Sequence, residues 1–264
     1  MLFRRIGVLV VAILALSFVL TGCGESSKEV DSLKRVQDSK ELTVVGSGGY
    51  KPFNFIEEGQ PVGFDVDTGK AIAERLGVEL NYVTSDWDGL VEGLKAGRYD
   101  GILGSMAITE ERQKEVDFTI PYYYSGAQLV VRADSGITNP EEMAGKSIAV
   151  ATGTNFVQDA ESLGATVQTY QDDNATIMEL INGRVDGVIT DKLVAIDAMS
   201  TIQGGEDLML CGEIMRLEQM AIAINKADTE LLAEINKILQ ELHDEGVMTE
   251  ISKKWLNGVD VTTK

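Results

Sequence analysis

Short apolar runs, rich in β-branched residues, alternate along the chain with segments in which apolar positions recur every three to four residues. Leu42–Val45 and Val78–Val83 are the first two short runs, and they predict buried strands. Asp67–Leu76 and Gly89–Ala96 carry the helical period. Strands that alternate with helices in this way predict an α/β fold with largely parallel sheets.

One residue pattern occurs twice. Leu94–Leu103 reads LKAGRYDGIL and Leu180–Ile189 reads LINGRVDGVI, and the two copies begin 86 residues apart. Each copy predicts a helix that ends at a glycine, a tight connection and then a buried strand. The separation is too long for a solenoid repeat, so it indicates two similar domains within one chain.

The repeated pattern also indicates where a ligand could bind. Ser105 comes three residues after Ile102, and Asp191 comes three residues after Val188. Both polar residues therefore follow predicted parallel strands, at the edge where open α/β sheets collect ligands. If the two domains face each other, Ser105 and Asp191 lie on opposite walls of one cleft. The alternative is that each is a turn or cap residue, and position alone does not decide between the two.

The N-terminal segment has the features of a secretion signal. Arg4 and Arg5 precede an apolar run over residues 6–20, which is shorter than the ~20 residues that a membrane-spanning helix needs. The run ends in Leu20-Thr21-Gly22-Cys23, which resembles the lipobox of bacterial lipoproteins. That resemblance implies that residues 1–22 are removed and that Cys23 carries a diacylglycerol, which would hold the protein at a membrane surface. The alternative is an ordinary signal peptide with an incidental cysteine.

Charge and length narrow the possible partners. The full sequence of 264 residues has a formal net charge of −19. Residues 1–22 contain two arginines and no acid, so the chain from Cys23 onward has 242 residues and a charge of −21. Phosphate binding needs clustered Lys and Arg, so this acidity argues against nucleic acid as a partner. The length fits one large domain or two of about 100–150 residues, after a polar tether over residues 23–37.

The chain offers little catalytic or metal-binding equipment. Its one histidine, His243, falls within Leu231–Gly246, where the apolar spacing predicts a helix. The one cysteine besides Cys23 is Cys211, which follows an apolar run and is interpreted as a small buried side chain. The sequence has no Cys/His cluster and no glycine-rich nucleotide loop. We therefore expect a binding protein that uses no metal and no cofactor.

A series of ordered motifs resembles the family-3 extracellular solute-binding proteins of bacterial ABC importers, which bind polar amino acids. The motifs are Tyr50–Phe53, Gly63–Asp67, Ile72–Leu76, Trp87–Leu90, Ile108–Arg112, Asp117–Phe118, Pro121–Tyr122, Gly153–Asn155 and Thr190–Asp191. They extend over roughly residues 38–258, and so many matches in order are more specific than any single motif. One residue departs from the pattern: Thr68 stands where the family usually has an apolar side chain.

The resemblance implies a type II periplasmic-binding-protein fold, with two α/β lobes joined by a two-segment hinge and a ligand cleft between the lobes. Lobe 1 would combine residues 38–128 with 222–264, and lobe 2 would comprise residues 129–221. The hinge would lie near Gln128–Arg132 and Met220–Ile224.

The resemblance also implies roles for individual residues. Arg112 corresponds to the arginine that binds the α-carboxylate of the ligand, for which its planar set of donors is suited. Asp191 corresponds to the acid that receives the α-ammonium. Tyr50 and Trp87 would provide aromatic surfaces for the ligand side chain. The other implied ligand-binding residues, which would use backbone or hydroxyl groups, are Gly104, Ser105, Gly153, Thr154 and Asn155.

Some positions bear on which amino acid is bound. Ser47 stands where many relatives have an acid that recognises the ligand side chain, which disfavours a cationic ligand. Ala107 stands where many have Ser or Thr, so one hydrogen bond to the ligand would be missing. Trp87–Gly89, Gly153–Asn155 and Tyr170–Asp173 are most similar to the cystine-binding branch of the family.

The function implied by the resemblance is that of a monomeric receptor, lipid-anchored at the extracytoplasmic face of the cell membrane. It would bind a polar amino acid, with cystine as the leading candidate, and deliver it to the permease of an ABC importer. One alternative is an enzyme on the same scaffold, similar to cyclohexadienyl dehydratase. Such an enzyme needs a carboxylic acid over the substrate ring, and none of the residues implied to bind the ligand is a glutamate. Another alternative is a sensor domain, although no kinase or cyclase domain is attached.

Overall fold

The computed structural model describes residues 32–263. The predicted signal peptide and Cys23 lie outside the described residues. The α-helices are α1 (Ser32–Ser39), α2 (Phe64–Leu76), α3 (Leu90–Lys95), α4 (Glu110–Glu115), α5 (Phe156–Ser162), α6 (Asp173–Ile181), α7 (Lys192–Thr201), α8 (Thr229–Asp244) and α9 (Val247–Trp255). The 3-10 helices are η1 (Trp87–Gly89), η2 (Ala133–Ser135), η3 (Pro140–Met143) and η4 (Gly205–Asp207). No helix in this part of the chain is long and apolar enough to cross a membrane.

The strands form one large sheet and one small one. They are β1 (Glu41–Gly46), β2 (Gly49–Tyr50), β3 (Asn54–Glu57), β4 (Gln60–Val62), β5 (Glu79–Thr84), β6 (Gly101–Ala107), β7 (Asp117–Phe118), β8 (Tyr123–Arg132), β9 (Ser147–Ala151), β10 (Thr166–Tyr170), β11 (Gly187–Asp191) and β12 (Leu208–Ile224). The large sheet has the order β10-β9-β11-β8-β12-β6-β1-β5, with β7 paired to β12, and the small sheet has the order β2-β3-β4. Strands β8 and β12 run antiparallel to their neighbours, whereas the other pairs of the large sheet are parallel.

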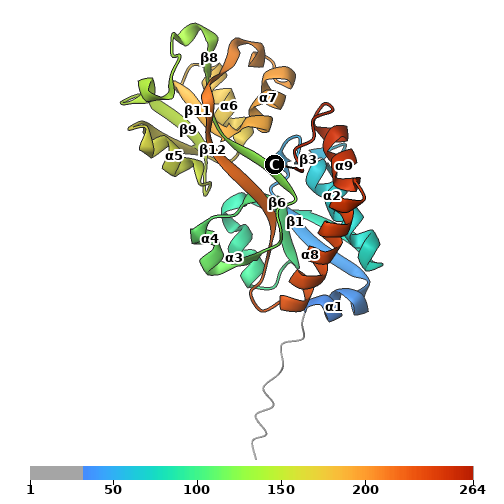
Figure 1. Ribbon diagram of the computed structural model, residues 1–264. Helices are drawn as coiled ribbons and strands as arrows, with labels where there is room; N and C mark the ends of the chain where they lie inside the picture. Colours follow the sequence, from blue (N-terminus) through green and yellow to red (C-terminus); the bar gives the residue numbers. More distant parts are fainter. Residues whose placement is uncertain (1–31, 264) are drawn as a thin grey trace, which may run out of the picture. The chain divides into compact units, whose positions relative to one another are not determined.

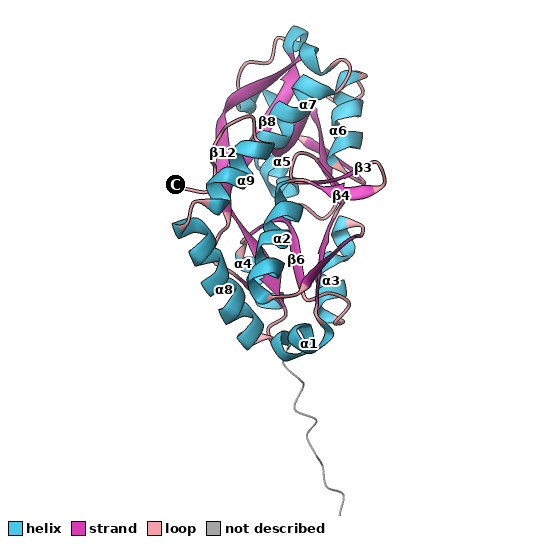
Figure 2. Ribbon diagram, turned by 90° about the vertical axis from the view of Figure 1, so that its right-hand side faces the viewer, coloured by secondary structure: helices cyan, strands magenta, loops and turns pink. Residues whose placement is uncertain are grey.

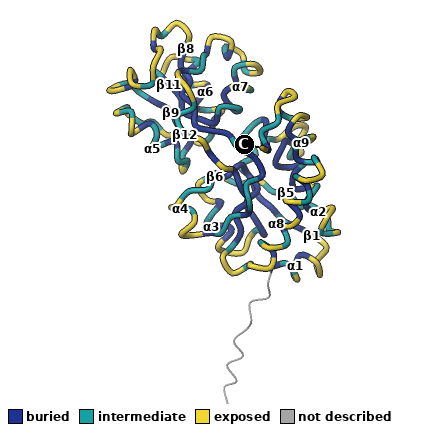
Figure 3. The backbone as a smooth tube through the Cα atoms, in the orientation of Figure 1, coloured by how far each residue is buried: buried dark blue, intermediate teal, exposed yellow. Residues whose placement is uncertain are grey.

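The sheet has two sections, each covered by its own helices (Figures 1 and 2). Strands β6, β1 and β5 make one section, and helices α2, α3 and α8 pack around it. Strands β11, β9 and β10 make the other, with helices α5, α6 and α7. The buried backbone in Figure 3 accordingly follows the strands of both sections. Among the strands of the described residues, the long strands β8 and β12 connect the two sections.

The hinge segments predicted from the sequence are displaced from where the chain passes between the sections. Residues 127–131 of β8 pair with β11, so Gln128–Arg132 lies mostly within the ladder of the second section. Residues 220–223 of β12 pair with β6, so Met220–Ile224 lies in the ladder of the first. The stretch between these ladders is Tyr123–Gly126, paired with residues 217–220. The passage therefore comes a few residues earlier in each strand than predicted.

The elements predicted from the sequence pattern are confirmed. Strands β1 and β5, helix α2 and the η1–α3 segment stand where the pattern places them. Both copies of the repeated pattern form a helix, a glycine turn and a buried strand, α3 to β6 and α6 to β11. The shared aspartate has the same role in each copy: Asp100 accepts the N–H of Thr43 at 2.7 Å, and Asp186 accepts the N–H of Ser147 at 2.9 Å. Each acid thus fixes its own strand to the neighbouring one.

The predicted tether is wrong for its last residues. From Ser32 onward the chain forms helix α1 rather than a polar linker. Val36 is fully buried, Leu33 packs against the same hydrophobic cluster, and Arg35 forms an ion pair with Asp100. Two apolar residues at helical spacing are enough to attach this helix to the first section, although the segment is polar on average.

Helix α2 begins within the motif Gly63–Asp67, at a point where the backbone of Gly63 lies close to the backbone of Phe53. Gly63 has a φ of 127°, and a Cβ atom there would lie 2.2 Å from the carbonyl oxygen of Phe53. Only glycine tolerates both conditions. Thr68, the departure from the family pattern, is fully buried, and its hydroxyl donates to the carbonyl of Phe64 at 2.9 Å. The polar group is thus satisfied within its own helix, so it can occupy an apolar position.

Candidate ligand-binding site

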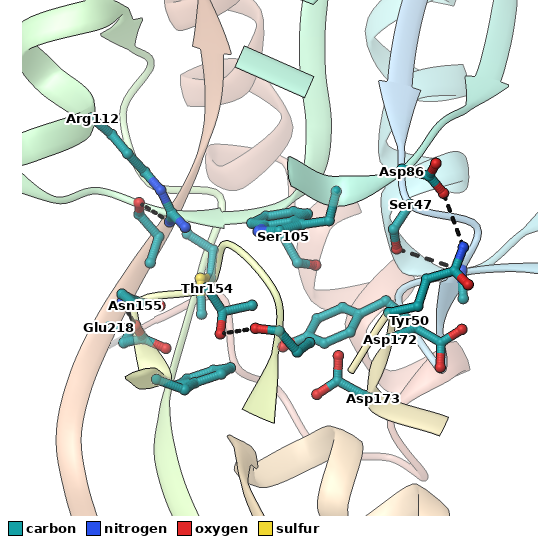
Figure 4. Close-up of a pocket in the computed structure, with 17 residues that line it drawn as sticks. Ser47, Tyr50, Asp86, Ser105, Arg112, Thr154, Asn155, Asp172, Asp173 and Glu218 are labelled. Atoms are coloured by element: carbon teal, nitrogen blue, oxygen red, sulfur yellow. Dashed lines mark hydrogen bonds between the residues drawn. The ribbon is translucent and has the colours of Figure 1, made fainter. Parts of the chain in front are cut away.

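A pocket lies where the two sections meet (Figure 4). It is lined by Ser47, Gly49, Tyr50, Asp86, Trp87, Ser105, Ala107, Arg112, Ala151, Thr154, Asn155, Phe156, Gln171, Asp172, Asp173, Glu218 and Met220. Six of the nine predicted ligand-binding residues are among them: Tyr50, Trp87, Ser105, Arg112, Thr154 and Asn155. The other three, Gly104, Gly153 and Asp191, do not line this pocket.

Arg112 reaches the pocket from helix α4. Thr109 caps that helix by accepting the backbone N–H of Arg112 at 3.2 Å. The guanidinium donates from Nη1 to the carbonyl of Ala107 at 2.9 Å and lies 5.4 Å from the centre of the Trp87 ring. No carboxylate of the described residues lies within ion-pair distance of it, in contrast to Arg216. Burial lowers the pKa of Arg112, but an arginine stays charged. It is thus a positive group that a carboxylate could pair with.

Ser105 lies within strand β6 rather than beyond its end, and it has a left-handed backbone with a φ of 57°. Its N–H donates to the Tyr122 hydroxyl at 3.0 Å, and its own hydroxyl donates to Asp65 Oδ2 at 2.9 Å. The donor of the Ser105 hydroxyl is therefore used by a buried carboxylate, so a ligand could contact this group only as a donor to its oxygen.

Asp65, from the Gly63–Asp67 motif, holds several segments around the pocket in place through hydrogen bonds. It is fully buried and also accepts the Tyr122 hydroxyl at 2.6 Å and the Asn54 amide at 2.7 Å. Asn54 in turn accepts the N–H of Gly48 at 2.9 Å. Burial raises the pKa of Asp65 to about 6, although these hydrogen bonds act to lower it. The motif residue therefore shapes the site without lining it.

The turn after β9 supplies the opposite side of the pocket. Gly153 has a φ of 76°, and a Cβ there would lie 3.2 Å from that of Asp88, so the two sections approach closely at this point. The Trp87 indole N–H donates across the gap to the Gly153 carbonyl at 3.2 Å. Thr154 donates its hydroxyl to the Ala151 carbonyl at 2.7 Å. Gly104, by contrast, belongs to β6 in the first section. It packs against the backbone of Gly46, and a Cβ atom on Gly104 would lie only 3.0 Å from the Gly46 Cα.

Tyr50 belongs to a stack of aromatic rings at the pocket. Its ring lies 5.7 Å from that of Phe53, which lies 4.8 Å from that of Tyr123. Burial is the main reason that the pKa of Tyr50 is raised well above its usual value, and Asp191 is the charge that contributes most. Tyr50 therefore stays neutral and offers an aromatic surface.

The acids of the site were only partly predicted. Asp172 caps helix α6 by accepting the N–H of Ala175 at 2.8 Å. Asp173 is buried and accepts the Thr190 hydroxyl, and burial raises its pKa to about 6. Asp191 accepts the N–H of Leu193 at 2.7 Å through Oδ1, and it ends β11. Its pKa is raised to about 7, first by burial and then by the charge of Glu218.

Sequence reasoning missed Asp86, Gln171 and Glu218 as pocket residues, and it did not give Asp172 and Asp173 a role in binding. Asp172 and Asp173 stand in the Tyr170–Asp173 motif, which could have indicated them, whereas no motif pointed to Glu218. None of the predicted ligand-binding residues is a glutamate, but Glu218 lines the pocket.

The pocket is acidic around Ser47 although position 47 itself carries no acid. Asp86 and Asp172 line the pocket at the same end as Ser47, as Figure 4 shows. With Asp173 and Glu218 they give four acidic residues against one arginine in the lining. The absence of an acid at position 47 therefore does not make the pocket neutral, and it does not count against a cationic ligand. Among the described residues, no group of three or more His, Cys, Asp or Glu side chains is arranged to hold a metal ion.

The chain belongs to the bacterial extracellular solute-binding proteins of family 3, whose family model matches residues 42–258. It is 31% identical to the L-cystine-binding protein TcyJ of Escherichia coli over 255 residues, which cover 95% of each chain. It is 31% identical to the arginine-binding extracellular protein ArtP of Bacillus subtilis, with 92% of this chain and 94% of that protein covered.

Solved structures give the same result. The P235GK mutant of ArgBP from T. maritima superposes with a TM-score of 0.80 at 36% identity, covering 86% of this chain and 99% of that chain. A substrate-binding protein of an ABC uptake transporter from Streptococcus pneumoniae, with bound histidine, superposes with a TM-score of 0.83 at 28% identity, covering 89% and 99%. The predicted family and the type II periplasmic-binding-protein fold are confirmed. The chain resembles amino-acid-binding proteins rather than enzymes, although an ancestral precursor of cyclohexadienyl dehydratase, itself an amino-acid-binding protein, has a TM-score of 0.80 at 31% identity and covers 85% and 99%.

Proposed function

We propose that this protein is a monomeric receptor that binds a polar amino acid in the pocket and delivers it to an ABC permease. The observation that carries the proposal is the Arg112 guanidinium, which lines the pocket with no described carboxylate within ion-pair distance, in a lining that also contains Asp86, Asp172, Asp173 and Glu218. An amino acid is a zwitterion, and this distribution of charge complements it. Binding would give Arg112 the bidentate carboxylate partner that its geometry favours.

The acids support a ligand with a second positive group. Asp86 and Asp172 line the end of the pocket away from Arg112 (Figure 4). Cystine carries a second ammonium, and arginine carries a guanidinium, so either would place positive charge among these acids. Cystine, arginine and histidine are the ligands in the names of similar proteins. The motifs favour cystine, which stays the leading candidate for the ligand. The charge of the pocket makes arginine the main alternative.

A thermal-shift screen over the twenty L-amino acids and L-cystine tests the proposed function. A ligand present at about 100 times its dissociation constant stabilises the folded protein by about 2.7 kcal/mol. We expect a clear rise in melting temperature with cystine, arginine or histidine and none with anionic amino acids. Incubation with prephenate or arogenate serves as the control for an enzyme on this scaffold, and we expect no turnover. A flat screen across all amino acids would contradict the proposal.

We further propose that the two sections are lobes that close over the ligand. Residues 32–124 with 219–263 would form lobe 1, and residues 127–216 would form lobe 2, joined by the paired segments of β8 and β12. Direct contacts already link the two. Gln171 donates to Asp86 at 3.2 Å and Asn174 donates to the Gly49 carbonyl at 3.4 Å. Lys51 lies 3.8 Å from Asp197. A ligand that contacts both lobes would favour this closed arrangement over an open one.

Closure predicts a change of size in solution. The radius of gyration from small-angle X-ray scattering should decrease when the amino acid found in the screen is added at saturation. The same amino acid added to the Arg112→Ala variant is the control, and it should leave the scattering curve unchanged. An unchanged radius in the saturated wild-type protein would count against a hinged receptor.

We also propose that Cys23 carries the lipid that anchors the receptor at the extracytoplasmic face of the cell membrane. The support is the Leu20-Thr21-Gly22-Cys23 sequence after a short apolar run. Cys23→Ser should shift the protein from the membrane fraction to soluble or unprocessed forms while its amino-acid affinity persists. Cys211→Ser is the matched control and should stay membrane-bound. A Cys23→Ser protein of mature size in the membrane fraction would contradict lipid anchoring.

A further inference from the structure

Two carboxylates near the pocket each have one oxygen without a hydrogen-bond partner. Glu218 is 4% exposed, and its Oε1 accepts the Asn155 amide and the Arg216 guanidinium, both at 2.6 Å. Its Oε2 is buried and has no partner among the described residues. Asp191 is fully buried, and its Oδ2 has none either, whereas its Oδ1 caps helix α7. A buried carboxylate oxygen without a partner is costly, so each of these oxygens indicates a missing donor.

The pairing of the strands places the two acids on one face of the sheet. Asp191 on β11 stands opposite Ala127 on β8, and Glu218 on β12 stands opposite Ser125 on β8. Residues two apart on a strand point to the same face, and so do residues directly opposite each other. Glu218 and Asp191 therefore flank β8 from the two sides. Between them stand the small side chains of Ser125 and Ala127 on β8, and the Ser125 hydroxyl acts on Asp191 as a hydrogen-bond donor that lowers its pKa.

The same face forms the floor of the pocket. Met220 stands two residues after Glu218 on β12 and opposite Ala107 on β6, and all three of these residues line the pocket. Arg112 lines the pocket too, and Glu218 is the charge that acts most strongly on it. In Figure 4, Arg112, Asn155 and Glu218 lie at the same end of the pocket. The unpartnered oxygen of Glu218 thus belongs to a residue at the end where the α-carboxylate of an amino acid would pair with Arg112.

We propose that Glu218 is a further binding residue, and that its Oε2 and Asp191 Oδ2 together accept the α-ammonium of the ligand. An ammonium has three donors, so it can satisfy both oxygens and still make a third bond. The proposal rests on the proposed function, because it presupposes an amino-acid ligand. It adds a second acid to the one that the family resemblance supplied.

Electrostatics support this arrangement. Glu218 raises the pKa of Asp191, after burial as the larger cause, which means that the two negative charges are close enough to repel each other. A positive group placed between two such acids removes the repulsion and supplies the missing donor at the same time. Arg216 cannot be that group, because it is already bound to Asp159 at 2.6 Å and to Glu218 Oε1.

The experiment measures affinity by calorimetric titration for wild type and Glu218→Gln. The ligands are L-arginine, L-cystine or L-histidine, whichever binds wild type best, and the deaminated counterpart with hydrogen in place of each α-ammonium. Glutamine keeps the size and the oxygen that accepts from Asn155, but it removes the charge. We expect Glu218→Gln to weaken binding of the amino acid about 10- to 100-fold, and binding of the deaminated ligand less than about 3-fold. Glu213→Gln, an exposed acid on the same strand, is the matched control and should bind both as wild type does.

The comparison of the two ligands separates direct contact from structural support. If Glu218→Gln weakens both ligands equally, Glu218 only holds Asn155 and Arg216 in place and the proposal is wrong. Unchanged affinity of Glu218→Gln for the amino acid would overturn it as well, while leaving the proposed function intact. If none of these amino acids binds to wild type, the proposed function fails in its ligand class, and this inference fails with it.

Discussion

Arg112→Ala is expected to weaken binding of the amino acid about 30- to 5,000-fold, which corresponds to about 2–5 kcal/mol. The guanidinium lies in the pocket with no carboxylate partner among residues 32–263, so without it the α-carboxylate of the ligand would lose its main counter-charge. Isothermal titration calorimetry with the amino acid found in the screen measures the loss. The variant should fold normally, because Arg112 projects from a short surface helix.

Two further variants show whether the loss of affinity depends on the geometry of the guanidinium. Arg112→Lys keeps the charge but loses the planar pair of donors, so its affinity should fall between those of wild type and Arg112→Ala. Arg98→Ala removes a positive charge outside the pocket lining and should leave affinity unchanged. Wild-type affinity of Arg112→Ala would show that the ligand carboxylate binds elsewhere, and the assignment of the site would have to be abandoned.

Asp191→Asn should lower the affinity at pH 8 at least about 30-fold and should flatten its pH dependence. In the ligand-free protein the pKa of Asp191 is raised to about 7, mainly by burial and further by Glu218. Only the ionised carboxylate can accept an ammonium as an ion pair, so protonation competes with binding. Wild-type affinity should therefore fall as pH decreases through 7, by about 10- to 100-fold between pH 8 and pH 5.

The stability of the ligand-free protein should change in the opposite direction. A carboxyl whose pKa is higher in the folded than in the unfolded state binds protons preferentially in the folded state, so stability falls as pH rises from about 4 to about 7. Asp65 and Asp173, whose pKa values burial raises to about 6, act in the same sense. Titrations and melting curves from pH 5 to pH 8 test both directions. A profile of Asp191→Asn as steep as that of wild type above pH 6 would assign the titration to a different group.

Local patterns in the sequence were sufficient for the elements and for much of the site. The two copies of the repeated pattern predicted α3–β6 and α6–β11 because a helix period, a terminal glycine and a buried strand are all local properties. Arg112 was predicted through its motif, and the structure places it in the pocket. Helix α1 was missed because its average composition is polar, and its attachment depends on the burial of Leu33 and Val36 against distant residues.

The rest depends on contacts between segments far apart in the sequence. The passage between the two sections is set by the pairing of β8 with β12, and its register cannot be read from either strand alone. Glu218 was missed for the same reason: only that register turns it toward the face that Asp191 shares. The hydrogen bond of the Ser105 hydroxyl depends on a network with Asp65 and Tyr122, whose members come from three separate segments. Such networks appear only in three dimensions.

The positions of the two tryptophans make the protein a fluorescent reporter of its own state. Trp87 lines the pocket, contacts Arg112 and donates to the Gly153 carbonyl across the gap between the two sections. Trp255 donates instead to Asp67 at 2.8 Å, and its ring packs edge-on against Phe55. We therefore expect a change in tryptophan emission on ligand binding to come mainly from Trp87, because Trp255 lies outside the pocket lining. Such a change would allow binding to the wild-type chain to be followed in rapid-mixing experiments without an added dye.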